Sequence, residues 1–259
     1  SQSRCNIEAV DVDDQGLPPE KLADDINVIF TTPSHHCPTA ATMPLSRRKR
    51  LLAKAQELDA IIVEDDYEFE MSFLEPALPA LKSLDNDGRV IYVGSFSKSL
   101  FPGMRLGYLV GPAPFIKEAR ALRASVFRHP PGHIQRTAAY FLSLGHYDAL
   151  IKRMSKQYEE RYLEMEKSLT KFDLTIAGKA QHGGSSFWVE TPKCTNAVKL
   201  AQKLLEMDVV IEPGDPFFVG ENHPKNFIRL AYSSISTNKI AAGVELIAKA
   251  ISDTGPITA

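Results

Sequence analysis

Short apolar runs and a helical pattern alternate along the first part of this chain, and that alternation limits the folds open to it. Residues 27–31, 60–63 and 89–93 are rich in β-branched residues and predict buried strands. Between the first two runs, leucine and alanine recur at helical spacing over residues 45–58. Strands that alternate with helices are typical of an α/β fold with a mainly parallel sheet.

A polar motif follows each of these predicted strands. The first strand leads into T-P-S-H-H-C-P-T-A, the second into E-D-D-Y-E-F-E, and the third into S-F-S-K-S-L-F-P-G-M-R. In parallel sheets, ligands bind beyond the carboxyl ends of the strands, which lie at one edge. We therefore expect residues 32–40, 64–70 and 95–105 to meet at that edge and to form a ligand site.

Lys98 lies in the third motif, between small hydroxyl residues and close to a strand end. Such a lysine is poorly placed for a surface salt bridge, and partial desolvation turns a lysine towards a nucleophilic neutral amine. Ser95 and Arg105 are placed to hold a phosphate beside it, the arginine through a bidentate pair. The motif therefore predicts covalent chemistry at Lys98 next to a phosphate.

Composition narrows the class of protein. The chain has 259 residues, 44% of them hydrophobic and 24% charged, which is typical of an ordinary soluble chain with ample core. Its formal net charge of −2 gives no reason to expect nucleic-acid binding by these residues. Cys5, Cys37 and Cys194 suggest neither a disulfide framework nor a zinc site.

We find no signal peptide and no long apolar run, so we expect a cytoplasmic location without membrane contact. The missing initial Met is consistent with a fragment.

The second half of the chain has a different pattern. A long, charged, amphipathic helix is expected over residues 148–169, where it would bridge two lobes. Short strands and helices follow it and predict a smaller α+β domain. We place the large domain, with its interdomain helices, at residues 1–154 and the small domain at residues 155–259. The other elements expected are an edge strand at 7–16, helices at 115–127, 133–144, 195–207 and 237–251, and strands at 172–176, 186–189, 209–211 and 227–231.

The lysine motif strongly resembles the lysine segment of fold type I pyridoxal 5'-phosphate (PLP) proteins, the aspartate aminotransferase superfamily. The resemblance implies that Lys98 forms the Schiff base with the cofactor aldehyde. It also implies that Ser95 and Arg105 bind the cofactor phosphate, and we include Ser97 among the cofactor-binding residues. The implied fold is that of a fold type I transferase whose N-terminal part lies outside this chain.

Asp65 and Tyr67 fit the same resemblance. An anion against the pyridine nitrogen keeps it protonated and makes the ring an electron sink. In fold type I proteins an Asp supplies that anion and a Tyr donates to the phenolic oxygen of the ring, which implies these roles for Asp65 and Tyr67. Two alternatives stay open: Asp66 takes the role if the register differs by one residue, or E-D-D-Y-E is only a solvated acidic turn.

The motif around Cys37 indicates a narrower resemblance. It corresponds to the N-P-T-G segment of the superfamily, whose Asn hydrogen-bonds the phenolic oxygen, but Cys37 replaces that Asn and Ala40 the Gly. A thiol is at most a weak donor, which argues against efficient transamination. The whole pattern, from T-P-S-H-x-x-P-T to S-F-S-K-S-L-x-P-G-x-R, resembles the aminotransferase-like domain of MocR/GabR transcription regulators.

This narrower resemblance implies a sensing function. An amino acid or amine effector would displace Lys98 and form an external aldimine, and Arg229 would hold the effector's carboxylate. The protein would be a homodimer and would contact DNA only through an N-terminal winged helix-turn-helix domain that this chain lacks. The alternatives are a working class I/II aminotransferase with Lys98 as proton carrier, or a degenerate domain that binds no cofactor and serves as a dimerisation scaffold.

Two further groups of residues have ordinary interpretations. The basic run Arg47-Arg48-Lys49-Arg50 is expected to be the solvated face of a helix rather than a nucleic-acid patch. The histidines in loops have no matching carboxylate or Cys spacing, so we expect no metal site; they are His35, His36, His129 and His133.

Overall fold

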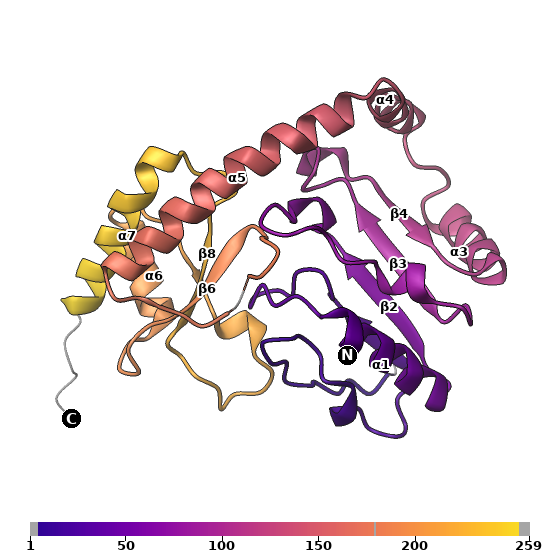
Figure 1. Cartoon of the computed structure of the whole chain (residues 1–259), viewed down its shortest axis with the longest axis horizontal. Coiled ribbons are helices and arrows are strands. Elements are labelled where there is room, and N and C mark those ends of the chain that lie inside the picture. The colour runs from indigo at the N-terminus through magenta and orange to yellow at the C-terminus, as the bar shows by residue number, and fades with distance from the viewer. Residues whose placement is uncertain (1–4, 179, 254–259) are drawn as a thin grey trace.

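Two four-stranded sheets organise the computed structural model, which describes residues 5–178 and 180–253 (Figure 1). The first sheet has the order β1-β2-β3-β4, and the second has the order β5-β6-β8-β7. The first sheet comes from the N-terminal part of the chain and the second from the C-terminal part. The candidate site residues are divided between them.

The first sheet begins with three parallel strands, as the alternating pattern predicts. These are β1 (Val28–Thr31), β2 (Ile61–Asp66) and β3 (Val90–Ser95), and β4 (Gly107–Val110) is antiparallel to β3. A parallel connection requires a crossover of about a dozen residues or more, usually a helix. The segment from β3 to β4 holds only the lysine motif and a short turn, so the chain returns in the antiparallel direction.

One face of this sheet is covered by α1 (Leu45–Glu57) and α2 (Leu81–Leu84). The core between them is apolar and consists of Leu17, Leu22, Ile29, Met43, Leu51, Ala55, Ala60, Ile62, Leu81 and Val90. On the other face Phe30 is 76% exposed, whereas its neighbour Ile29 is 3% exposed. Residues 27–31 were predicted to be a buried strand, which is correct for only one side of β1.

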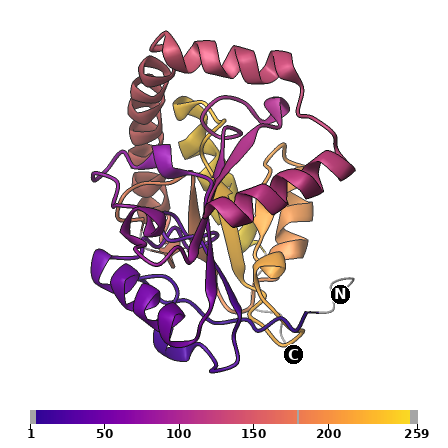
Figure 2. The same ribbon diagram turned by 90° about the vertical axis from the view of Figure 1, so that its right-hand side faces the viewer.

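Three helices lead from the first sheet to the second. They are α3 (Ala113–Val126), α4 (Gly132–Ser143) and α5 (His146–Lys171), and Figure 2 turns α3 and α4 towards the viewer. Helix α5 extends from α4 to α7 (Figure 1), and it places Tyr158, Tyr162 and Leu169 in the second core. The predicted bridging helix is therefore confirmed. The proposed boundary between residues 154 and 155 falls inside α5 and stays a prediction.

The second sheet is antiparallel and small. Its strands are β5 (Thr175–Ile176), β6 (Ser186–Glu190), β7 (Glu212–Pro213) and β8 (Phe227–Ala231). Side chains of α5, α6 (Ala197–Leu205) and α7 (Thr237–Ser252) pack with it in a single apolar core. The α+β character predicted for this part is observed.

The remaining elements are short. The 3-10 helices are η1 (Pro19–Lys21), η2 (Phe69–Met71), η3 (Pro102–Met104) and η4 (Asp215–Phe217). The edge strand expected at residues 7–16 is absent, and this segment forms only an isolated bridge between Asp13 and Gly16. Within the described ranges, no helix is both long and apolar enough to cross a membrane.

Candidate functional site

The three polar motifs meet at the carboxyl ends of β1, β2 and β3, as predicted. The Tyr67 hydroxyl donates a hydrogen bond of 3.2 Å to the carbonyl oxygen of His35, which joins the second motif to the first. Lys98 Nζ lies 3.6 Å from a carboxylate oxygen of Glu68, which joins the third motif to the second. The parallel register of the strands therefore brings residues far apart in sequence into one site.

The register of β2 separates the two adjacent carboxylates. Asp65 lies opposite Val93 and Asp66 opposite Gly94, and successive strand residues point to opposite faces. Asp66 is buried on the α1 face, where the Tyr92 hydroxyl donates a 3.2 Å hydrogen bond to it. Asp65 is exposed and shares its face with Ser95, two residues beyond Val93 on β3.

Burial controls the ionisation of both carboxyl groups. It raises the pKa of Asp66 to about 6, opposed by the hydrogen bonds that this carboxyl accepts. Desolvation also raises the pKa of Asp65. The open position of Asp65 lets it act on a ligand at the sheet edge, whereas Asp66 is engaged beneath the sheet.

Lys98 forms an ion pair, contrary to the expectation that it would be poorly placed for one. Its side chain is 42% exposed, and its partner Glu68 is almost fully buried. The turn from β2 into η2 brings Glu68 beneath the lysine motif, a proximity that local sequence does not reveal. Glu68 also accepts a hydrogen bond from the hydroxyl of Ser185, which belongs to the second half of the chain.

The other residues of the lysine motif are accessible. The Ser95 hydroxyl oxygen accepts a 3.1 Å hydrogen bond from the backbone N–H of Ser97, and both residues are half-buried. Arg105 ends η3 in the left-handed region with φ 47° and is exposed. Among the described residues its guanidinium has no hydrogen-bond or ion-pair partner. These three side chains are therefore available to an anionic ligand.

Cys37 and Tyr67 form the wall of the site next to the second sheet. Burial raises the pKa of the Cys37 thiol, and the nearby positive charge of Arg229 opposes that rise. Burial also raises the pKa of the Tyr67 hydroxyl, with a further contribution from the charge of Glu68. Both groups are therefore neutral near pH 7 and can take part only as hydrogen-bonding groups.

Arg229 brings the second sheet to this wall. It is the middle residue of β8. Its Nη1 donates to Glu212 at 2.7 Å and its Nε donates to the Ser186 hydroxyl at 3.0 Å. Burial alone would lower the pKa of Arg229, but the hydrogen bond to Glu212 and the neighbouring Cys37 outweigh it and raise the pKa.

The basic run on α1 corrects the sequence interpretation. Lys49 and Arg50 are exposed as predicted, but Arg48 is 0% exposed and Arg47 is also buried. Arg47 pairs with Asp13. Arg48 donates to three backbone carbonyl groups, at 2.9, 2.9 and 3.0 Å, which belong to Met43, Pro79 and Pro33. Arg48 is therefore a buried brace for the loop of the first motif. It supplies hydrogen-bond donors to carbonyl groups that the folded loops would otherwise leave without partners.

The histidines differ in their surroundings. His35 is buried, and desolvation lowers its pKa to about 4, aided by the charges of His182 and Arg48. Burial also lowers the pKa of His36 to about 4. His129 and His133 are exposed. Among the described residues, no group of His, Cys, Asp and Glu side chains is arranged to hold a metal ion.

Glu68 and Glu212 are the site residues that sequence reasoning missed. Glu68 lies in the second polar motif, E-D-D-Y-E-F-E, but the sequence does not show that it is close to Lys98. Glu212 precedes a Pro-Gly turn and gives no local signal, because its partner Arg229 lies on the neighbouring strand. Both partnerships are non-local, so only the fold could reveal them.

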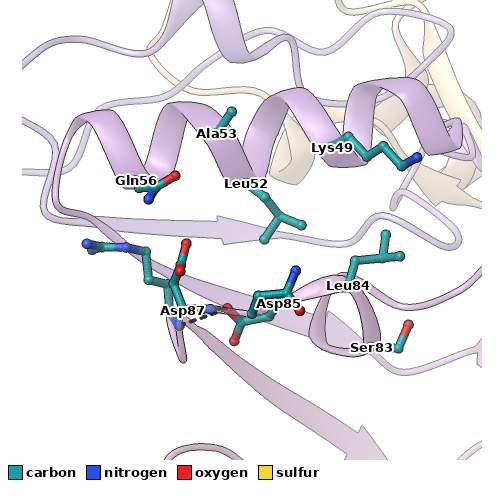
Figure 3. Close-up of a pocket in the computed structure, with 10 residues that line it drawn as sticks. Lys49, Leu52, Ala53, Gln56, Ser83, Leu84, Asp85 and Asp87 are labelled. Carbon is teal, nitrogen blue, oxygen red and sulfur yellow. Dashed lines mark hydrogen bonds between the residues drawn. The ribbon is translucent and has the colours of Figure 1, made fainter.

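A surface cavity of about 490 Å³ lies away from this site, between α1 and the segment that precedes β3 (Figure 3). Lys49 and Gln56 of α1 line one side, and Ser83, Asp85 and Asp87 line the other. This is the amino end of β3, whereas Ser95 and Lys98 follow its carboxyl end. The cavity contains none of the predicted site residues and is not the candidate site.

The chain is similar to known proteins over most of its length. Residues 5–247 match the family model "Aminotransferase class I and II". The chain belongs to this family. It is 56% identical to the HTH-type transcriptional regulator TauR of Rhodobacter capsulatus, over 95% of this chain and 51% of that protein. It is 38% identical to the probable rhizopine catabolism regulatory protein MocR of Rhizobium meliloti, over 52% of this chain and 27% of that protein. The predicted resemblance to MocR-type regulators is therefore confirmed.

Solved structures confirm the fold type I aminotransferase fold. The kynurenine aminotransferase of Pyrococcus horikoshii, in complex with PMP, superposes with a TM-score of 0.87 at 30% identity. That match covers 95% of this chain and 63% of the enzyme. The chain thus spans about half the length of the TauR regulator and less than two thirds of the enzyme, so it represents part of that fold.

Proposed function

We propose that this chain is the PLP-binding, effector-sensing domain of a MocR/GabR-type transcription regulator. The observation that carries the proposal is the convergence of Lys98, Asp65 and Ser95 at one sheet edge, opposite Arg229 from the second sheet. The similarity to TauR over 95% of this chain supports the regulator class. DNA binding would belong to a winged helix-turn-helix domain outside this chain, in a cytoplasmic homodimer.

The residues present fit PLP. When bound, the cofactor would supply an aldehyde for an amine and an electron-withdrawing ring. Lys98 would hold the aldehyde, and Ser95, Ser97 and Arg105 would hold the phosphate, since their polar groups are accessible. Asp65 is on the open face of β2 and would face the ring nitrogen.

Two more groups complete the proposed cofactor contacts. Tyr67 would donate to the phenolic oxygen, and Cys37 would lie beside it as a weak donor. Glu68 would place a carboxylate oxygen 3.6 Å from Lys98 Nζ. Arg229 would bind the effector's carboxylate. In the finer form of the proposal, the amine of the effector would replace Lys98 on the cofactor aldehyde, which would give an external aldimine.

A working aminotransferase is the second candidate, because the family model and the solved structures both describe aminotransferases. Titrating the complete PLP-loaded protein with amino acids separates the two functions. A regulator gives a saturable spectral change and a change in DNA affinity, with at most one keto acid formed per site. Repeated keto-acid formation with an added keto-acid acceptor would show that the protein is an enzyme.

A further inference from the structure

The guanidinium of Arg229 is already engaged by protein groups. Nη1 bonds Glu212 at 2.7 Å and Nε bonds Ser186 at 3.0 Å. The remaining nitrogen, Nη2, has no hydrogen-bond partner among the described residues. Glu212 lies directly across from Arg229 in the pairing of β7 with β8. The residue that we propose as the effector clamp therefore begins in an ion pair within its own sheet.

This arrangement limits how an acidic ligand can bind. A guanidinium grips a carboxylate best through two parallel N–H groups, which are either Nη1 with Nη2 or Nε with Nη2. The first pair is available only if Glu212 leaves, and the second only if Ser186 leaves. While both protein bonds persist, a ligand obtains a single hydrogen bond from Nη2.

Glu212 is the partner that can leave. Its side chain is 48% exposed, whereas residue Ser186 is 7% exposed on β6, which is hydrogen-bonded on both sides by β5 and β8. The ion pair is open to water on the Glu212 side, whereas the Arg229 side chain is 15% exposed, and a pair that water reaches contributes little free energy. The Glu212 carboxylate can therefore rotate into solvent at low cost, while the Ser186 hydroxyl is fixed in the sheet.

The same pair lies close to the proposed cofactor site. Arg229 and Glu212 both act on the pKa of the Cys37 thiol, although they belong to the second sheet and Cys37 to a loop of the first. A ligand that reaches this wall would meet both charges. A negative group on the ligand would be attracted by Arg229 and repelled by Glu212.

We propose that Glu212 is a specificity-determining residue, which occupies the acid-binding edge of Arg229 until an acidic group of the effector takes its place. The proposal rests on the proposed function, because it takes Arg229 as the effector clamp. Glu212 would weaken the binding of amino acids that carry a carboxylate. It would have no effect on simple amines, which have no group to exchange.

The test compares Glu212→Gln with the wild type in the complete PLP-loaded protein. Each is titrated with L-alanine, 3-aminopropanoate and ethylamine, and the absorbance of the cofactor is recorded. The dissociation constants of the two amino acids should fall about fivefold, as expected for removal of a partly exposed ion pair, while that of ethylamine stays the same. Glu212→Ala should act in the same direction if the Gln variant is poorly folded.

Glu206→Gln is the matched control. It removes the same charge from an exposed position at the end of α6, so it should leave all three constants unchanged. Arg229→Lys should keep PLP bound and weaken the two amino acids but not ethylamine, because lysine lacks the planar fork. The decisive quantity is the ratio of the amino-acid dissociation constants to that of ethylamine. If the wild type responds but this ratio is unchanged or higher in Glu212→Gln, only the role of Glu212 is overturned. A wild-type protein that binds no PLP or responds to no amine would overturn the proposed function as well.

Discussion

At the scale of single residues, the register of β2 decides which of two adjacent carboxylates can reach a ligand. Asp65 is on the open face with Ser95, and Asp66 is on the covered face with Tyr92. The sequence alone left both residues as candidates for the contact to the ring nitrogen, because a one-residue shift in register exchanges the faces. The pairing with β3 favours Asp65.

Asp65→Asn should weaken PLP binding on the order of 1.5–3 kcal/mol, because the pyridinium loses a charge-assisted hydrogen bond. Asp66→Asn should have a smaller effect on PLP, because that carboxyl is engaged by Tyr92 beneath the sheet. Equilibrium titration of the two apo variants with PLP measures both effects. A larger loss in Asp66→Asn would contradict the assignment.

Local sequence was sufficient for some residues and not for others. Lys98 and Asp65 lie in motifs that follow predicted strands, so their position at one edge of the sheet could be predicted from the sequence. The ion pair of Lys98 with Glu68 was missed, since it depends on how η2 turns back beneath the lysine motif. The partnership of Arg229 with Glu212 was missed because two short strands pair only in the folded sheet.

At the scale of elements, α1 supports the site through a buried arginine. Arg48 donates to the carbonyl groups of Met43, Pro33 and Pro79, of which Pro33 belongs to the first polar motif. A charge pattern at helical spacing predicts a solvated face, and the sequence could not show that one cation is enclosed by loops. The helix is thus both a cover for the sheet and a brace for its neighbouring loop.

Arg48→Ala should lower the free energy of unfolding by about 3–5 kcal/mol, because it leaves buried carbonyl groups and nearby carboxylates without their cation. Arg50→Ala, on the exposed side of the same helix, should change it by less than about 0.5 kcal/mol. Urea denaturation of both variants gives the comparison. Equal stability of the two variants would show that Arg48 is not a brace.

At the scale of the whole molecule, loops that belong to the two halves of the chain come into close contact. A Cβ atom at Gly178 would lie 2.0 Å from the carbonyl oxygen of Thr39, and one at Gly183 would lie 2.4 Å from that of Met71. The sequence predicted two parts and a bridging helix, but a contact between loops so far apart in sequence has no local signal. These contacts hold loops of the second half of the chain against loops of the first sheet.

Gly178→Ala should therefore push the Thr39 loop away, lower stability by about 1–3 kcal/mol and weaken the amino-acid response. Gly243→Ala is the control, because a Cβ there meets nothing within 4 Å on α7. Alanine in a helix should raise stability by about 0.5–1 kcal/mol without changing the response. Thermal unfolding and ligand titration measure both variants. An unchanged amino-acid response in Gly178→Ala would show that the contact with the Thr39 loop does not affect effector binding.

The most direct test of the proposed cofactor site is to find where PLP attaches to the complete protein. The complete protein is loaded with PLP, reduced with borohydride, digested and analysed by peptide mass mapping. We expect one label, on Lys98, and no label when Lys98→Ala is treated in the same way. A label on Lys82 or Lys117, or an unlabelled wild-type protein, would contradict the proposal that Lys98 holds the cofactor.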